Sequence, residues 1–104
     1  MHHKNISGEV LKILVSNDDG IYSKGIYELV KALKEIGEVT VVAPLTEQSA
    51  VGHAITISRP LMVRRATKNS NFLGYAVCGT PADCVKLGIT ELSDKPVDMV
   101  ISGI

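Results

Sequence analysis

Two adjacent carboxylates stand in a short polar segment near the start of the chain, where Asn17, Asp18, Asp19 and Gly20 follow an apolar run. Two unpaired carboxylates side by side repel each other. A hard divalent cation such as Mg²⁺ or Mn²⁺ would relieve that repulsion, because oxygen atoms are its preferred ligands. Gly20 would let the backbone turn closely around the ion. All these residue types are also common in turns, so the segment alone fits an ordinary solvated turn equally well.

Other polar groups follow later apolar runs. Ser49 could contribute a hydroxyl oxygen to a cation held by the two aspartates, although taken alone it is typical of a loop or a helix cap. Gly79 and Thr80 precede a predicted helix, and backbone amides at a helix start can receive phosphate. The terminal segment 102–104 also follows an apolar run, and in a parallel sheet it would lie at the same edge as the groups named above. These groups together indicate a site for an anion and a cation.

Two other side chains have competing interpretations. Asn17 could donate a hydrogen bond to phosphate or could shape the turn, and the residues favour neither. His53 could have a catalytic role because imidazole groups commonly exchange protons near neutral pH, but a structural role is favoured because no partner carboxylate lies at a useful spacing. His2 and His3 are either native or remnants of a purification tag, and we exclude them from any mechanism.

An alternation of strands and helices would position these groups. Apolar runs over 10–16, 38–43, 75–78 and 97–102 predict buried strands of a mostly parallel sheet. Helical spacing of apolar residues predicts helices over 23–36 and 81–92. The loops after parallel strands reach the same edge of a sheet, where open α/β folds bind their ligands.

Several boundaries can also be predicted. Gly37 is expected to cap the first helix, and Pro44 to end the second strand. Short strands over 54–57 and 61–65, with a loop over 67–71, are expected to form an antiparallel excursion. Asp83 and Asp98 are expected at a helix start and a strand boundary.

Composition sets limits on the chain as a whole. Its 104 residues, 45% of them hydrophobic, predict one domain or part of one. Lys plus Arg and Asp plus Glu both total 11, so no broad electrostatic attraction to nucleic-acid polymers or membranes is expected. No apolar run or leader indicates a membrane or secreted protein, and we expect a soluble, cytoplasmic one. Cys78 and Cys84 are expected to be reduced and buried.

Four segments in order resemble the SurE family of phosphatases: ILVSNDDG, PLTEQSAVGHAIT, GTPADCVKLG and the terminal SGI. The resemblance covers residues 11–104, which we interpret as the amino-terminal part of a single SurE-like domain. Residues 1–10 fall outside it, as an extension or a tag remnant. One departure is local: residues 45–47 lack the acidic residue that the family commonly has directly after the proline.

The resemblance implies a Rossmann-like α/β fold with a mostly parallel sheet flanked by helices. It implies one divalent metal ion per subunit, Mg²⁺ or Mn²⁺, held by Asp18, Asp19, Ser49 and an asparagine expected directly after Ile104. Family members are longer, and their carboxyl-terminal part supplies arms for homodimer or homotetramer assembly. The resemblance therefore places this chain in a larger oligomeric protein.

The activity implied is hydrolysis of nucleoside 5′- and 3′-monophosphates, with some action on polyphosphate. The metal would polarise a phosphoryl oxygen and help to generate hydroxide from bound water. Asp18 and Asp19 would be catalytic as well as metal ligands, while Asn17, Ser49, Gly79 and Thr80 would contact the substrate.

Two alternatives stay open at this stage. An acidic pair after the first strand of a parallel sheet can also hold Mg²⁺ in a receiver-like or nucleotide-binding signalling module. Such a module needs a phosphoacceptor aspartate at the end of a later strand, and no predicted strand ends in one. The other alternative is that the chain is an inactive fragment of a phosphatase, because one metal ligand lies beyond Ile104.

Overall fold

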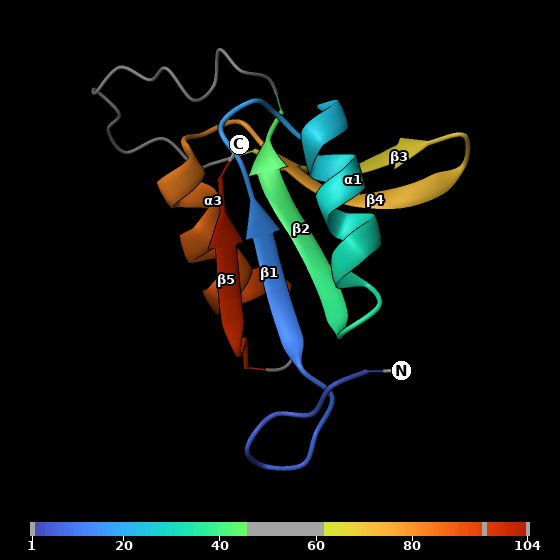
Figure 1. Ribbon diagram of the computed structural model, residues 1–104. Helices are drawn as coiled ribbons and strands as arrows, with labels where there is room; N and C mark the ends of the chain where they lie inside the picture. The colour runs from blue at the N-terminus through green and yellow to red at the C-terminus, as the bar shows by residue number, and fades with distance from the viewer. Residues whose placement is uncertain (1, 46–61, 95, 104) are drawn as a thin grey trace.

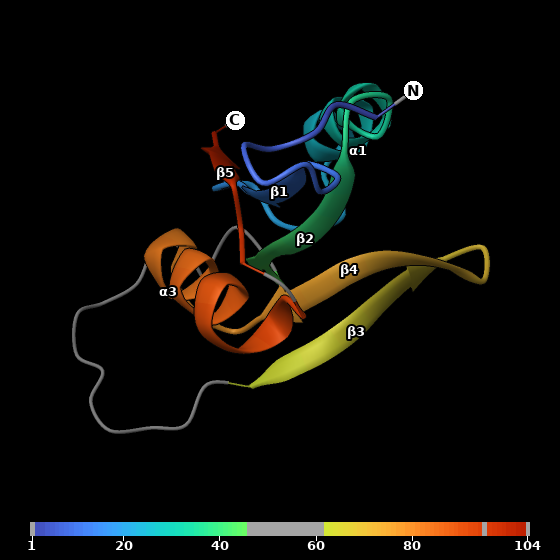
Figure 2. The same cartoon turned by 90° about the horizontal axis from the view of Figure 1, so that it is seen from below.

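The computed structural model describes residues 2–45, 62–94 and 96–103, which form a five-stranded sheet with a helix on each face (Figures 1 and 2). The strands are β1 (Lys12–Ser16), β2 (Glu38–Pro44), β3 (Val63–Lys68), β4 (Asn71–Val77) and β5 (Met99–Ser102). The helices are α1 (Lys24–Leu33) and α3 (Pro81–Leu87), and α3 continues into a π-helical turn, η1 (Gly88–Leu92). The predicted alternation of strands and helices is confirmed.

The strands lie in the order β3-β4-β2-β1-β5. β1 pairs in parallel with β2 and with β5, and β2 pairs in parallel with β4. β3 runs antiparallel to β4 and forms a hairpin with it. The mostly parallel sheet with a small antiparallel part is therefore as predicted. The antiparallel partner of β3 is β4, however, and the predicted partner strand over 54–57 lies outside the described residues.

Alternate residues of the central strands face different helices. Ile13 and Val15 of β1 belong to a core cluster that also contains Ile26 of α1. Leu14, between them, packs in a second cluster with Cys84 of α3. Apolar side chains at every position of a strand are what a sheet covered on both faces requires. The continuous apolar run in the sequence therefore reflects the burial of both faces of the strand.

The first helix ends earlier than predicted, and Gly37 is not its cap. α1 stops at Leu33 with Lys34 at the C-cap position. Gly37 serves a different purpose, because a Cβ atom built there would lie 2.5 Å from the carbonyl oxygen of Leu11. The glycine is needed where the chain passes close to the backbone that leads into β1.

The loop predicted over 67–71 is shorter in the structure. β3 continues to Lys68 and β4 starts at Asn71, so Asn69 and Ser70 alone form the turn. Both have positive φ values, 53° and 69°, as a tight two-residue hairpin turn requires. The sequence did not predict that the two strands continue this far, because their end residues are polar. Polar residues occur there because one face of the hairpin is exposed.

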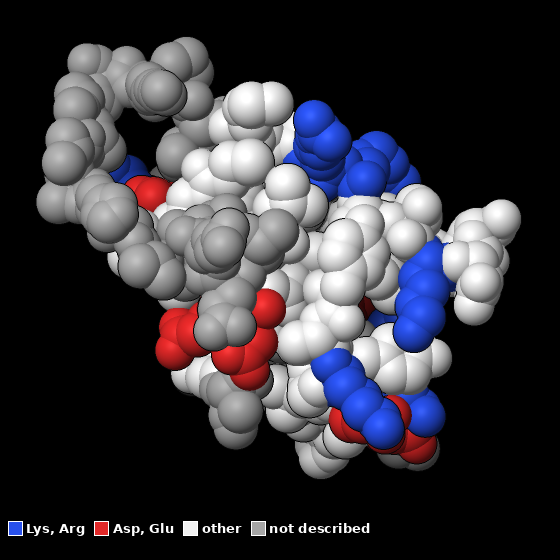
Figure 3. Space-filling model, turned by 90° about the horizontal axis from the view of Figure 1, so that it is seen from above, with Lys and Arg blue, Asp and Glu red and all other residues white. Residues whose placement is uncertain are grey.

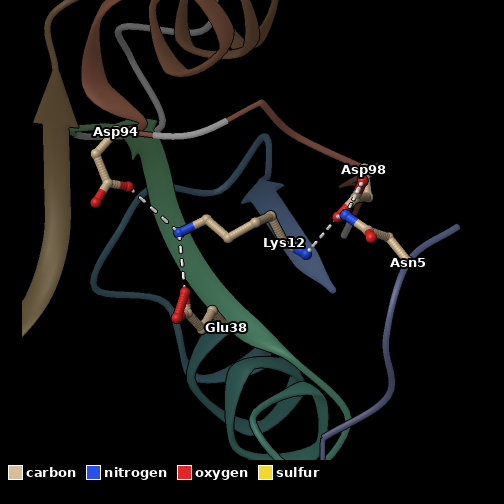
Figure 4. A network of polar contacts seen from close by, with 5 residues as sticks. All are labelled: Asn5, Lys12, Glu38, Asp94 and Asp98. Atoms are coloured by element: carbon tan, nitrogen blue, oxygen red, sulfur yellow. Dashed lines mark hydrogen bonds and ion pairs between the residues drawn. The ribbon is translucent and has the colours of Figure 1, made fainter. Parts of the chain in front are cut away.

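The amino-terminal residues pair with the body of the domain. Lys4 and Val10 form an antiparallel bridge, and the His3 N–H donates to the Ile36 carbonyl oxygen over 2.8 Å. Asp98 accepts a 2.8 Å hydrogen bond from the Lys12 N–H and two from the Asn5 side chain, at 3.1 and 3.2 Å (Figure 4). Asp98 thus lies at a strand boundary, as predicted, and ties together segments far apart in sequence.

Within the described part of the chain, no helix has the length and apolar character needed to cross a bilayer.

Candidate metal centre

The acidic turn after β1 is held in place by the side chain of Asn17, which is 1% exposed. Its amide nitrogen donates to the Gly20 carbonyl oxygen over 3.0 Å and to the Ser23 hydroxyl over 2.9 Å. Its carbonyl oxygen accepts the Gly20 N–H over 3.1 Å. Both amide hydrogens of Asn17 are used inside the turn, so the geometry favours the turn-shaping interpretation over donation to phosphate.

Ser23 connects this turn to α1. As the N-cap residue it accepts a hydrogen bond from the Ile26 N–H at 3.4 Å, while it also receives the Asn17 amide. Gly20 adopts a φ of 106°, in a region that L side chains rarely enter, so the turn needs a glycine here. The turn therefore has one defined shape between the end of β1 and the start of α1.

The two carboxylates of the turn face outward. Asp18 and Asp19 are exposed, and neither makes a hydrogen bond or an ion pair with a described residue. Their oxygen atoms are free to bind a cation. No cluster of three or more His, Cys, Asp or Glu side chains occurs in residues 2–45, 62–94 and 96–103. A site built on this turn would need further donors besides these two carboxylates.

The end of β2 lies next to the acidic turn. The Ile21 N–H donates to the Pro44 carbonyl oxygen over 2.8 Å, and the Leu45 N–H donates to that of Val77 over 2.8 Å. Pro44, the last residue of β2, therefore contacts the turn directly. Ser49 and His53 follow Leu45 in the sequence, but both lie outside the described residues.

β4 and β5 end at the same edge. In the register of the sheet Ser16 pairs with Ser102, and the Gly103 N–H donates to the Ser16 carbonyl oxygen over 3.3 Å. The last residues of β2, β4 and β5 are Pro44, Val77 and Ser102, so none of these strands ends in an aspartate that could accept phosphate in a receiver-like module.

Thr80 begins α3 with a reciprocal pair of hydrogen bonds. The Asp83 N–H donates to the Thr80 hydroxyl over 3.2 Å, and the Asp83 carboxylate accepts the Thr80 N–H over 2.9 Å. Pro81 occupies the first turn. The predicted helix start and the predicted place of Asp83 are confirmed. Because the cap uses both the N–H and the hydroxyl of Thr80, this start of α3 is rigid.

The two cysteines differ in their surroundings. Cys84 is fully buried, and burial raises the pKa of its thiol to about 12. The Ser16 hydroxyl acts in the opposite direction, but it makes no hydrogen bond of ordinary geometry, so its contact with the thiol is weak. Cys78 is exposed at the end of β4, and its predicted burial is wrong. Both are free thiols, as predicted.

Ser23 was not among the predicted site residues. Its signal in the sequence is its place three residues before Ile26, the first apolar residue of the helical pattern, which is typical of an N-cap. The hydrogen bond from Asn17 has no such signal, because it depends on how the turn folds back.

The mostly parallel sheet, with an acidic turn at the carboxyl end of its first strand, defines a Rossmann-like α/β domain with a candidate cation site at that edge. A family model described as Survival protein SurE matches residues 13–104. The chain belongs to the SurE family, as the four sequence segments predicted.

Individual relatives agree with this assignment. The chain is 62% identical over 94 residues to the 5′-nucleotidase SurE of Syntrophus aciditrophicus (strain SB), covering 90% of this chain and 35% of that protein. It is 57% identical over 94 residues to the 5′-nucleotidase SurE of Syntrophobacter fumaroxidans, covering 90% of this chain and 38% of that protein. The chain thus spans little more than a third of the length of these relatives.

A solved structure supports the fold. The crystal structure of the SurE protein from Aquifex aeolicus superposes with a TM-score of 0.71 at 46% sequence identity. The match covers 89% of this chain and 37% of that one.

Proposed function

We propose that this protein is a divalent-metal-dependent phosphomonoester hydrolase that acts on nucleoside 5′- and 3′-monophosphates. The observation that carries the proposal is the pair of unpartnered carboxylates, Asp18 and Asp19, on a turn fixed by Asn17 at the carboxyl edge of the sheet. The names of the curated relatives, 5′-nucleotidase SurE, support the choice of substrate class.

The donor chemistry of the turn fits a hard divalent cation. Two carboxylates without a partner among the described residues provide anionic oxygen ligands, and their exposed position leaves room for water and substrate oxygens to complete the shell. We propose Asp18 and Asp19 as ligands of one Mg²⁺ or Mn²⁺ ion per subunit, with Ser49 as a third. When bound, the ion would act as a Lewis acid that polarises the phosphoryl group and neutralises charge in the transition state.

The other groups of the chain would position the reactants. Asn17 and Ser23 fix the backbone of the turn that carries the two carboxylates, so the backbone needs little reorganisation when substrate binds. Gly79 and Thr80 stand directly before α3, and we propose that this backbone approaches the phosphate of the substrate. Since the capping box uses the Thr80 N–H and hydroxyl, Thr80 would act chiefly by shaping the loop.

Further aspects of the proposal rest on membership of the SurE family. We infer that polyphosphate is an additional substrate, that the protein acts in the cytoplasm and that it assembles as a homodimer or homotetramer. Size-exclusion chromatography with light scattering tests the assembly, and a monomer at micromolar concentration would contradict it.

The activity is tested by release of inorganic phosphate from nucleoside 5′- and 3′-monophosphates in the presence of Mg²⁺ or Mn²⁺. We expect EDTA to abolish release and Asp18→Ala to reduce kcat/KM at least about a hundredfold, because the variant removes an anionic ligand from the cation.

Glu9→Gln is the matched control, since it removes an exposed carboxylate that precedes β1 by three residues, at the opposite end of the strand from the acidic turn. It should leave kcat/KM unchanged. Normal turnover by folded Asp18→Ala protein would show that the ligand assignment is wrong.

A further inference from the structure

A groove with a volume of about 800 Å³ lies between α1 and the β3–β4 hairpin. Both elements stand on the same side of the molecule in Figure 1, and the groove includes Ile21 and Tyr22 directly after the acidic turn. Its apolar residues include Ile26 and Val41, which belong to the core, so the base of the groove is rigid.

The charges around this groove are strongly unbalanced. Its lining includes four lysines and one acidic residue, Glu28, although the whole chain has zero formal net charge. The lysines are Lys24, Lys31, Lys34 and Lys68. Seen from the carboxyl ends of the strands, most of the visible basic side chains gather on the side of α1 and the hairpin (Figure 3). Zero net charge therefore conceals a local cationic surface.

Little in the described structure neutralises these lysines. Lys31 approaches Glu28 at 3.9 Å, but both side chains are about 60% exposed, so this pair is weak. The other three lysines form no ion pair with a described residue. Such a cluster of ammonium groups favours an anionic ligand.

Aromatic rings stand among the charges. Tyr22, Tyr27 and Phe72 line the groove and are 57%, 45% and 44% exposed. The ammonium groups of Lys31 and Lys68 lie 5.5 and 5.4 Å from the centre of the Tyr27 ring. A planar base can stack on such a ring in place of an ammonium group, which is then available to bind the adjoining phosphate.

We propose that this groove binds a short single strand of nucleic acid, with phosphates on the lysines and bases on the aromatic rings. The length of the cationic row supports a chain over a single nucleotide. Lys24 begins α1 and Lys34 is its C-cap residue, so the two are about 15 Å apart along the helix axis, farther than one phosphate can bridge. Lysines that track a backbone beside stacking aromatics are the usual means of binding single strands.

The proposal is tested by fluorescence anisotropy with a labelled single-stranded oligouridylate of about ten nucleotides, in EDTA so that no divalent ion bridges it to the acidic turn. We expect log Kobs to fall with log salt at a slope between about −2 and −3, since each phosphate neutralised contributes about −0.7. The double variant Lys31→Ala/Lys68→Ala should bind at least about tenfold more weakly, with a slope shallower by about 1.4.

Lys86→Ala is the matched control, because Lys86 is an exposed helical lysine outside the groove. It should bind like the parent. Tyr27→Leu should weaken oligouridylate binding about fivefold or more but leave inorganic polyphosphate binding unchanged, because polyphosphate has no base to stack. All substituted side chains are exposed, and circular dichroism confirms that each variant is folded.

The groove would be ruled out as a nucleic-acid site if oligouridylate does not bind, or if the double lysine variant loses no more affinity than Lys86→Ala. Equal losses for polyphosphate and oligouridylate on Tyr27→Leu would contradict base stacking. These results do not depend on phosphate release at the acidic turn, so the two proposals can fail separately.

Discussion

At the scale of single residues, Asn17 fixes the backbone of the turn on which Asp18 and Asp19 stand. Its side chain makes three hydrogen bonds within a turn of seven residues, and it is buried while Asp18 and Asp19 are exposed. An amide can donate and accept at once, which a carboxylate cannot do. Within the turn, Asn17 therefore has a structural role, while Asp18 and Asp19 are available to bind a ligand.

Replacing Asn17 should show this coupling. Asn17→Ala leaves the Gly20 N–H and carbonyl without a side-chain partner, and we expect it to lower the free energy of unfolding by about 1–3 kcal/mol. Ser23→Ala removes the N-cap and should cost about 1 kcal/mol. Urea denaturation of both single variants and the double variant measures the coupling, which should exceed about 0.5 kcal/mol. Simple additivity would contradict the network.

The two thiols should react at very different rates. At pH 8, iodoacetamide should modify exposed Cys78 in the native protein and leave buried Cys84 intact until denaturant is added, as mass spectrometry can show. The pKa of Cys84 is raised by burial from 9.0 to about 12, so its contribution to stability is fully present below pH 9 and declines as the pH rises further. Equal modification of both thiols in folded protein would refute this assignment.

At the scale of elements, a polar network around Lys12 links β1 to β2 at the end of the sheet opposite the acidic turn (Figure 4). The Lys12 ammonium lies 3.1 Å from the Glu38 carboxylate on β2 and 3.4 Å from that of Asp94. Burial lowers the pKa of Lys12, but the hydrogen bonds and negative charges of Glu38 and Asp94 outweigh it, so the pKa is raised overall. The charged form is therefore favoured at neutral pH.

Asp98 should contribute more to the free energy of unfolding than the ion pairs of the Lys12 ammonium group. Glu38 and Asp94 are 46% and 82% exposed, so Lys12→Met should cost less than about 1 kcal/mol. Asp98→Ala removes hydrogen bonds to the Lys12 N–H and to Asn5, and we expect a loss of about 1–2 kcal/mol. Thermal or urea unfolding compares them, and a larger effect of Lys12→Met would reverse the ranking.

The elements themselves could be predicted largely from side-chain pattern. The apolar run that became β1 and the Ser23 start of α1 are read from local residues, because burial on two faces and capping both leave local signals. Gly37 was misplaced because its role is a close approach to Leu11, a contact that depends on the folded chain. The turn at Asn69 and Ser70 was predicted, but with too great a length, because the ends of its flanking strands are polar.

The site was predictable to a lesser degree. Asp18 and Asp19 stand out as an acidic pair after a buried strand, and the structure exposes both. The hydrogen bond by which Asn17 and Ser23 fix this turn could not be predicted from residue spacing, since it depends on tertiary geometry. The place of Ser49 relative to the pair stays a prediction.

At the scale of the whole molecule, the acidic turn and the lysine-lined groove are adjacent but separate surfaces. The acidic turn lies at the carboxyl edge of the sheet, while the lysines of α1 and the hairpin line a groove beside it. The chain as a whole has zero formal net charge, so its ligands must be attracted by these local fields. The chain belongs to the SurE family, and the proposed metal centre on the acidic turn is the central claim of the functional account.

The most direct test of that account is calorimetric titration of Mn²⁺ into the parent protein, Asp18→Asn, Asp19→Asn and the control Glu9→Gln, with thermal unfolding of the same samples. We predict one binding site in the parent and in the control, and at 100 times the Kd a stabilisation of about 2.7 kcal/mol. Each aspartate variant, although folded, should lose most of the affinity and the stabilisation. Unchanged Mn²⁺ affinity in both aspartate variants would contradict a metal centre on the acidic turn.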